Sequence, residues 1–132
     1  MNAKSAGVKT PKTVLVVEDD EQVRRFSLNV LRMHGYRTLE AFDGEMGLAT
    51  FLRHKHEVDL VLTDIVMPVP GPEMVEKIWK VQPSAKIVFV SGTAGFSDLP
   101  IHLRTAPLLH KPFTVESLVK CVGSVLMEAP QR

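Results

Sequence analysis

The fold of this chain is constrained most by the regular alternation of short apolar runs with longer segments of helical periodicity. Five runs have the length and composition of strands, and they cover residues 14–17, 36–41, 60–63, 86–90 and 107–110. Strands that alternate with helices are joined by crossover connections and form parallel sheets. The sequence therefore predicts an α/β domain with a five-stranded parallel sheet.

Two helices are expected between the first three runs. In the first helix, apolar residues recur at helical spacing before Gly35, which can end the helix. These residues are Val23, Phe26, Val30 and Met33. In the second helix, Asp43 can cap the N-terminus. The residues expected to face inward there are Met46, Ala49 and Leu52.

Two more helices are expected in the second half of the chain, and one connection is weak. Pro72 suits the first turn of a helix after the third run, and Thr114 can cap a helix after the fifth. The residues that share a face of this last helix are Val115, Leu118, Val122 and Val125. Residues 92–106 contain Gly95 and Pro100 and lack a clear apolar stripe. Any helix there should be short or irregular.

The length and cysteine content indicate one domain in a reducing compartment. A chain of 132 residues that is 45% hydrophobic can bury one core and is too short for two. We expect residues 12–127 to form the domain, residues 1–11 a flexible lead-in and residues 128–132 a short tail. Cys121 is the single cysteine, so an internal disulfide is excluded, and a cytoplasmic location is expected.

Charge and hydropathy argue against two classes of partner. The formal net charge is +1 and the basic residues are spread along the chain, whereas nucleic-acid binders concentrate positive charge on one face. The apolar runs are much shorter than the ~20 residues that a membrane-spanning helix needs. We therefore expect neither direct nucleic-acid binding nor a membrane span.

Polar side chains follow the ends of four predicted strands. They are Glu18, Asp19, Asp20, Asp64, Ser91 and Lys111. In an open parallel sheet, ligands bind beyond the carboxyl ends of the strands, so these side chains should lie together. Clustered carboxylates repel one another unless a cation is present, and hard oxygen ligands suit Mg²⁺. The sequence predicts a magnesium site at this edge.

Four of these segments carry a specific resemblance. The runs VLVVEDDEQVRR, VLTDIVMP, VFVSGT and HKPF occur in this order, each at a predicted strand end. Together they resemble the receiver domain of response regulators and of hybrid histidine kinases, over roughly residues 12–127. The resemblance implies a flavodoxin-like, doubly wound sheet with strand order 2-1-3-4-5 and helices on both faces.

The resemblance also implies which acidic residue accepts the phosphoryl group and which residues bind the metal. Asp64 matches the phosphoacceptor, whose carboxylate attacks a phosphorus atom in line. Magnesium would be held by Asp19, Asp64 and the main-chain carbonyl of Val66, with Glu18 acting through water. Asp20 stands where the family does not require an acid.

Two further positions match groups that contact the phosphoryl group. Lys111 matches the lysine that pairs with it as a point charge, and Ser91 matches the hydroxyl that hydrogen-bonds one of its oxygens. Pro112 resembles a proline that is cis in this family. The family usually has an aromatic residue where this chain has Leu108, so we expect the response to phosphorylation to pass through Ser91 and residues 92–106.

The implied function is a phospho-switch that changes a partner-binding surface. The phosphoryl group would come from a sensor histidine kinase or a histidine phosphotransfer protein, and the downstream protein is unknown. Such a domain catalyses only its own phosphorylation and dephosphorylation. The alternatives are a Mg²⁺-dependent phosphatase of the haloacid dehalogenase type with an aspartate nucleophile, and a flavodoxin-like cofactor binder.

Overall fold

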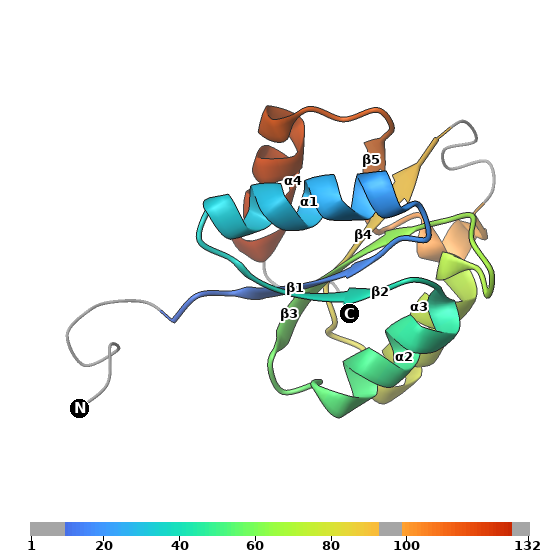
Figure 1. Ribbon diagram of the computed structural model, residues 1–132. Helices are drawn as coiled ribbons and strands as arrows, with labels where there is room; N and C mark the ends of the chain where they lie inside the picture. Colours follow the sequence, from blue (N-terminus) through green and yellow to red (C-terminus); the bar gives the residue numbers. More distant parts are fainter. Residues whose placement is uncertain (1–9, 93–98, 128–132) are drawn as a thin grey trace, which may run out of the picture.

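Five parallel strands form one sheet at the centre of the protein (Figure 1). The computed structural model describes residues 10–92 and 99–127, so the predicted tail and most of the predicted lead-in lie outside the described residues. The strands are β1 (Thr13–Val17), β2 (Arg37–Ala41), β3 (Val58–Asp64), β4 (Ile87–Ser91) and β5 (Leu108–His110). Their order is β2-β1-β3-β4-β5. The predicted fold class and strand order are confirmed.

Burial explains why three of the strands are continuous apolar runs. All residues of β1 and β4 are buried, as are those of β3 except Asp59. A parallel strand covered on both faces is apolar throughout. β2 lies at the edge of the sheet and is largely exposed or half-buried, which accounts for its alternating sequence.

Helices cover both faces of the sheet, as the resemblance implied. They are α1 (Glu21–Met33), α2 (Gly44–Arg53), α3 (Gly71–Val81) and α4 (Val115–Met127), with a short 3-10 helix η3 (Ile101–Leu103) before β5. Figure 1 shows α1 and α4 on one face and α2 and α3 on the other. Two apolar cores result, one around Leu15, Phe51 and Ile78 and the other around Leu31 and Leu118.

The predicted inward face of α2 was wrong. Met46, Ala49 and Leu52 are exposed, whereas Gly44, Gly47 and Phe51 are buried. The helix packs so closely that a Cβ on Gly47 would overlap side chains of β1 and α3. Because glycine adds nothing to an apolar pattern, periodicity pointed to the neighbouring face.

The predicted face of α1 was also partly wrong. Val30 is buried, but Met33 is 83% exposed and Phe26 is 38% exposed. The helix turns Leu28 and Leu31 toward the sheet instead. In α4 the predicted face is confirmed for the three buried residues Leu118, Val122 and Val125, whereas the fourth, Val115, is exposed.

The described part of the segment before β5 has only a short helix, as its lack of an apolar stripe predicted. Within residues 99–106 only η3 is helical, and residues 93–98, with Gly95, lie outside the described part. In the two described ranges, every helix is too short or too polar to span a membrane.

Candidate functional site

Three acidic side chains meet at the carboxyl edge of the sheet. Glu18 follows β1 and is 3% exposed, Asp64 ends β3 and is 6% exposed, and Asp19 is exposed. One carboxylate oxygen from each of the three lies within 4.8 Å of the others. The structure thus brings together the acidic residues that the sequence predicted.

Lys111 joins the two buried carboxylates. Its Nζ lies 2.9 Å from Glu18 Oε1 and 2.9 Å from Asp64 Oδ2. The residue directly follows β5, and its main-chain N–H donates to the Ser91 carbonyl at 2.8 Å. The peptide bond to Pro112 is cis, as the resemblance implied.

The electrostatics of this cluster favour a cation. Burial raises the pKa of Glu18 to about 7, although the hydrogen bond from Lys111 opposes the shift. For Lys111, burial alone would lower the pKa, but hydrogen bonds to Asp64 and Glu18 outweigh burial and raise it. One ammonium therefore does not fully compensate the buried negative charge, and a further positive charge nearby would stabilise ionised Glu18.

The donor set fits a hard divalent cation. Mg²⁺ binds oxygen ligands at about 2.1 Å, so oxygens on opposite sides of one ion lie roughly 4.2 Å apart. The 4.8 Å limit on the cluster is close to that separation, and the three ligands are carboxylates. The Val66 N–H points to Asp64 Oδ1 at 3.4 Å, whereas a metal-binding role for the Val66 carbonyl stays a prediction.

Asp20 has a role that the sequence interpretation missed. Its side chain accepts hydrogen bonds from the N–H groups of Gln22 and Val23 at 2.9 and 3.1 Å, which caps the N-terminus of α1. Its own N–H donates to Glu18 Oε2 at 3.2 Å. An acid three residues past β1 and directly before a helical segment was the available signal. Asp20 therefore links the acidic residues after β1 to the N-terminus of α1.

The loop from β3 to α3 is tightly packed against Asp64. A Cβ on Gly71 would collide with the Asp64 main-chain oxygen, and the Gly71 N–H donates to the Ile65 carbonyl at 3.2 Å. Val69 has φ 52°, a left-handed conformation that β-branched residues rarely adopt. The close approach to the Asp64 main chain therefore requires glycine at position 71.

Ser91 and Leu108 lie near the site on the next two strands. Ser91 is buried at the end of β4, the strand that pairs with β3. Leu108 is half-buried at the start of β5, so the position is aliphatic as the sequence showed. The structure therefore places Ser91 at the end of the strand next to the one that Asp64 ends, whereas a role for its hydroxyl stays a prediction.

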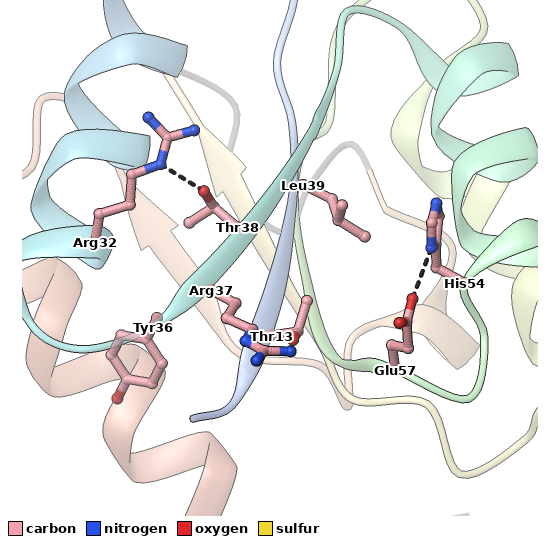
Figure 2. A pocket seen from close by; sticks show the side chains of 8 residues that line it. All are labelled: Thr13, Arg32, Tyr36, Arg37, Thr38, Leu39, His54 and Glu57. Atoms are coloured by element: carbon pink, nitrogen blue, oxygen red, sulfur yellow. Dashed lines mark hydrogen bonds and ion pairs between the residues drawn. The ribbon is translucent and has the colours of Figure 1, made fainter. Parts of the chain in front are cut away.

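Among the hollows lined by residues 10–92 and 99–127, one has Lys111 in its wall and another lies at the other end of the sheet. The first, of about 470 Å³, is lined mainly by apolar side chains between α1 and the residues after β5, and Lys111 forms part of its wall. The second, of about 450 Å³, lies where β1 and β2 begin (Figure 2) and includes Arg32 and His54. It is therefore at the opposite end of the sheet from the candidate site.

Comparison with known proteins gives one consistent family. The family described as response regulator receiver domain matches residues 14–123. Response regulator receiver protein CpdR of Brucella abortus (strain 2308) is 36% identical over 125 residues, which cover 89% of this chain and 99% of CpdR. Sensor kinase CckA of the same organism is 35% identical over 127 residues, which cover 93% of this chain and 13% of CckA.

Solved structures agree with this family. The receiver domain of the hybrid histidine kinase CckA has a TM-score of 0.74 at 29% identity, covering 87% of this chain and 99% of that chain. A CheY-like receiver domain protein from Methanospirillum hungatei JF-1 has a TM-score of 0.79 at 27% identity, covering 89% and 94%.

Proposed function

Since the chain belongs to the response regulator receiver domain family, a family of phosphoacceptors in two-component signalling, we propose that Asp64 is its phosphoacceptor. The observation that carries this proposal is the contact of Lys111 Nζ with Asp64 Oδ2 at 2.9 Å. It provides a fixed cation beside a buried carboxylate at the edge of a parallel sheet where ligands bind. Glu18 and Asp19 complete an acidic cluster around the same carboxylate.

We further propose that Mg²⁺ binds to Asp19, Asp64 and the Val66 carbonyl, with Glu18 reached through water. The support is the cluster of three carboxylates within 4.8 Å and the raised pKa of Glu18. When bound, the ion supplies positive charge that neutralises phosphoryl oxygens.

The protein's own groups then act on the phosphoryl group in separate ways. An Asp64 oxygen forms the new bond to phosphorus, while the bond between phosphorus and the donor's imidazole nitrogen breaks. Lys111 pairs with a phosphoryl oxygen as a point charge. The Ser91 hydroxyl donates a hydrogen bond to another oxygen once the group has arrived. Because Lys111 and Ser91 lie at the ends of sheet strands, the positions of their hydrogen-bonding groups are set before the reaction.

The partners follow from the chemistry. The donor is a sensor histidine kinase or a histidine phosphotransfer protein, and the output is binding of a downstream protein rather than of nucleic acid. The apolar hollow beside Lys111 offers the donor a surface next to the reacting groups. The domain catalyses only its own phosphorylation and dephosphorylation, in the cytoplasm.

The phosphatase alternative is not favoured. The chain matches the receiver domain family, and its candidate nucleophile Asp64 ends β3, whereas a phosphatase of the haloacid dehalogenase type has its nucleophile after the first strand.

Intact-mass measurement tests the proposal. Wild type treated with acetyl phosphate and Mg²⁺ should gain one phosphoryl group, and the gain should disappear with a chelator or in Asp64→Ala. Asp59→Asn is the matched control, because Asp59 lies on the same strand and accepts a hydrogen bond from the Thr13 N–H at its other end. A phosphoryl gain in Asp64→Ala equal to that of wild type refutes the assignment.

A further inference from the structure

Arg24 is a nearly buried charged residue that joins three segments around the acidic site. Its side chain is 11% exposed, and its Nε lies 3.0 Å from Glu40 Oε1. Its Nη1 donates to the main-chain carbonyl of Glu18 at 2.9 Å. Its guanidinium carbon lies 4.3 Å from the centre of the Phe42 ring. Arg24 therefore connects α1 to the residue that follows β1 and to the end of β2.

These contacts hold Arg24 in one orientation. A guanidinium is planar and its donors point in fixed directions, so two hydrogen bonds to different segments define its position. The stacked Phe42 ring adds a cation–π contact that restricts the group further. The Glu18 carbonyl is thus bound by a donor that has little freedom to move.

The carbonyl that Arg24 binds determines the direction of Asp19. The carbonyl of Glu18 and the N–H of Asp19 belong to one planar peptide unit. The Glu18 N–H is also fixed, since it donates to the Ala41 carbonyl at 3.0 Å. Within residues 10–92 and 99–127, the exposed Asp19 side chain makes no hydrogen bond of its own. The backbone that Arg24 holds therefore sets the direction of the Asp19 Cα–Cβ bond, from which the carboxylate reaches Glu18 and Asp64.

We propose that Arg24 is a positioning residue for the metal site: by fixing the Glu18–Asp19 peptide, it aims the Asp19 carboxylate at Glu18 and Asp64 and so raises the affinity for Mg²⁺. This inference rests on the proposed function. Outer partners that orient metal ligands typically contribute about 10- to 100-fold to metal affinity. The effect of Arg24 should lie at the lower end of that range, because it acts through the backbone.

Arg25 offers a matched control for the test. It is the next residue of α1, its side chain is 74% exposed, and its contact is an ion pair with Glu21 at 3.4 Å. Arg24→Met and Arg25→Met remove the same charge from the same helix, and methionine keeps an apolar stem over Phe42. Calorimetric Mg²⁺ titration should give about tenfold weaker binding for Arg24→Met and less than twofold for Arg25→Met. Equal affinities in the two variants would overturn the proposal, even if Arg24→Met lowered the melting temperature.

A second readout needs no metal. In the metal-free protein, ¹⁵N relaxation order parameters at Asp19 and Asp20 should be near the rigid value of about 0.85 in wild type and Arg25→Met, and clearly lower in Arg24→Met. Unchanged order parameters in Arg24→Met would overturn the positioning role. A wild type that bound no Mg²⁺ would overturn the proposed function, whereas the order parameters would still decide whether Arg24 holds this loop.

A further variant keeps the test valid if Arg24→Met does not fold. Arg24→Lys retains the charge, but one ammonium cannot reproduce both directed contacts of the guanidinium, with Glu40 and with the Glu18 carbonyl. It should show weaker Mg²⁺ binding and lower order parameters at Asp19 than wild type. Wild-type values of both quantities in Arg24→Lys would overturn the proposal.

Discussion

Replacing Lys111 with methionine removes the ammonium that both buried carboxylates contact. The side chains of Glu18 and Asp64 are 4% and 8% exposed, and that of Lys111 is 21% exposed. Removing one partner of a buried ion pair costs about 3–5 kcal/mol of unfolding free energy. Glu18 can avoid most of the cost of remaining charged without its partner. Burial already raises the pKa of Glu18 to about 7, so the carboxylate can take up a proton. We therefore expect a loss of about 1–3 kcal/mol in the metal-free protein at neutral pH.

The loss should depend on pH in a defined direction. The Lys111 hydrogen bond lowers the pKa of Glu18, so the variant should bind the Glu18 proton more tightly than wild type. A raised carboxyl pKa means that the folded state binds more protons than the unfolded state, so stability falls as pH rises through that range. The destabilisation by Lys111→Met should accordingly be larger at pH 8 than at pH 6.

Urea unfolding followed by Trp79 fluorescence measures this loss. Lys120→Met is the control, because Lys120 is exposed on α4, and its effect should stay within about 0.5 kcal/mol. Added Mg²⁺ should recover part of the stability lost in Lys111→Met, since a cation that binds only the folded state stabilises it. A loss equal to that of Lys120→Met at both pH values, or a loss that grows toward acid pH, would refute the reasoning.

Three further results are expected. Asp19→Asn should weaken Mg²⁺ binding by more than about tenfold and slow phosphorylation with it; calorimetry that gave wild-type affinity would contradict the ligand assignment. Wild-type Mg²⁺ affinity should be about tenfold lower at pH 6 than at pH 8, because ionised Glu18, with its pKa raised by burial to about 7, is the form that favours the ion; a flat profile would count against this. Val66 is 70% exposed and offers no side-chain hydrogen bond to a hydrolytic water, so Val66→Asn should shorten the phosphoryl lifetime roughly 2- to 10-fold. Equal decay rates of the two phosphorylated proteins would exclude that role for position 66.

The sheet and much of the site could be predicted because each depends on local signals. β1, β3 and β4 are buried on both faces, so they appear in the sequence as short, nearly continuous apolar runs. The carboxyl ends of parallel strands meet at one edge, which brings Glu18 and Asp64 together without knowledge of tertiary contacts. The strand order, in contrast, followed from the resemblance to a family and not from the pattern.

The features that escaped prediction depend on close packing or on distant contacts. The inward face of α2 was misread because glycines occupy it. Asp20 belongs to the acidic run but caps α1, and composition cannot distinguish a cap from a ligand. Arg24, on α1, contacts Glu40, which lies on β2 and is 16 residues away in the sequence. Its role becomes visible only when the β1 and β2 ends are seen side by side.

The position of the phosphoryl group tests the central claim most directly. Wild-type protein is phosphorylated with acetyl phosphate and Mg²⁺, the acyl phosphate is reduced with borohydride, and the modified residue is located by peptide mass spectrometry. The account predicts reduction at Asp64 alone, and none in Asp64→Asn, whose side chain has nearly the same shape. Reduction at Glu18 or Asp19 in wild type, or a modified residue elsewhere in Asp64→Asn at wild-type yield, would contradict it.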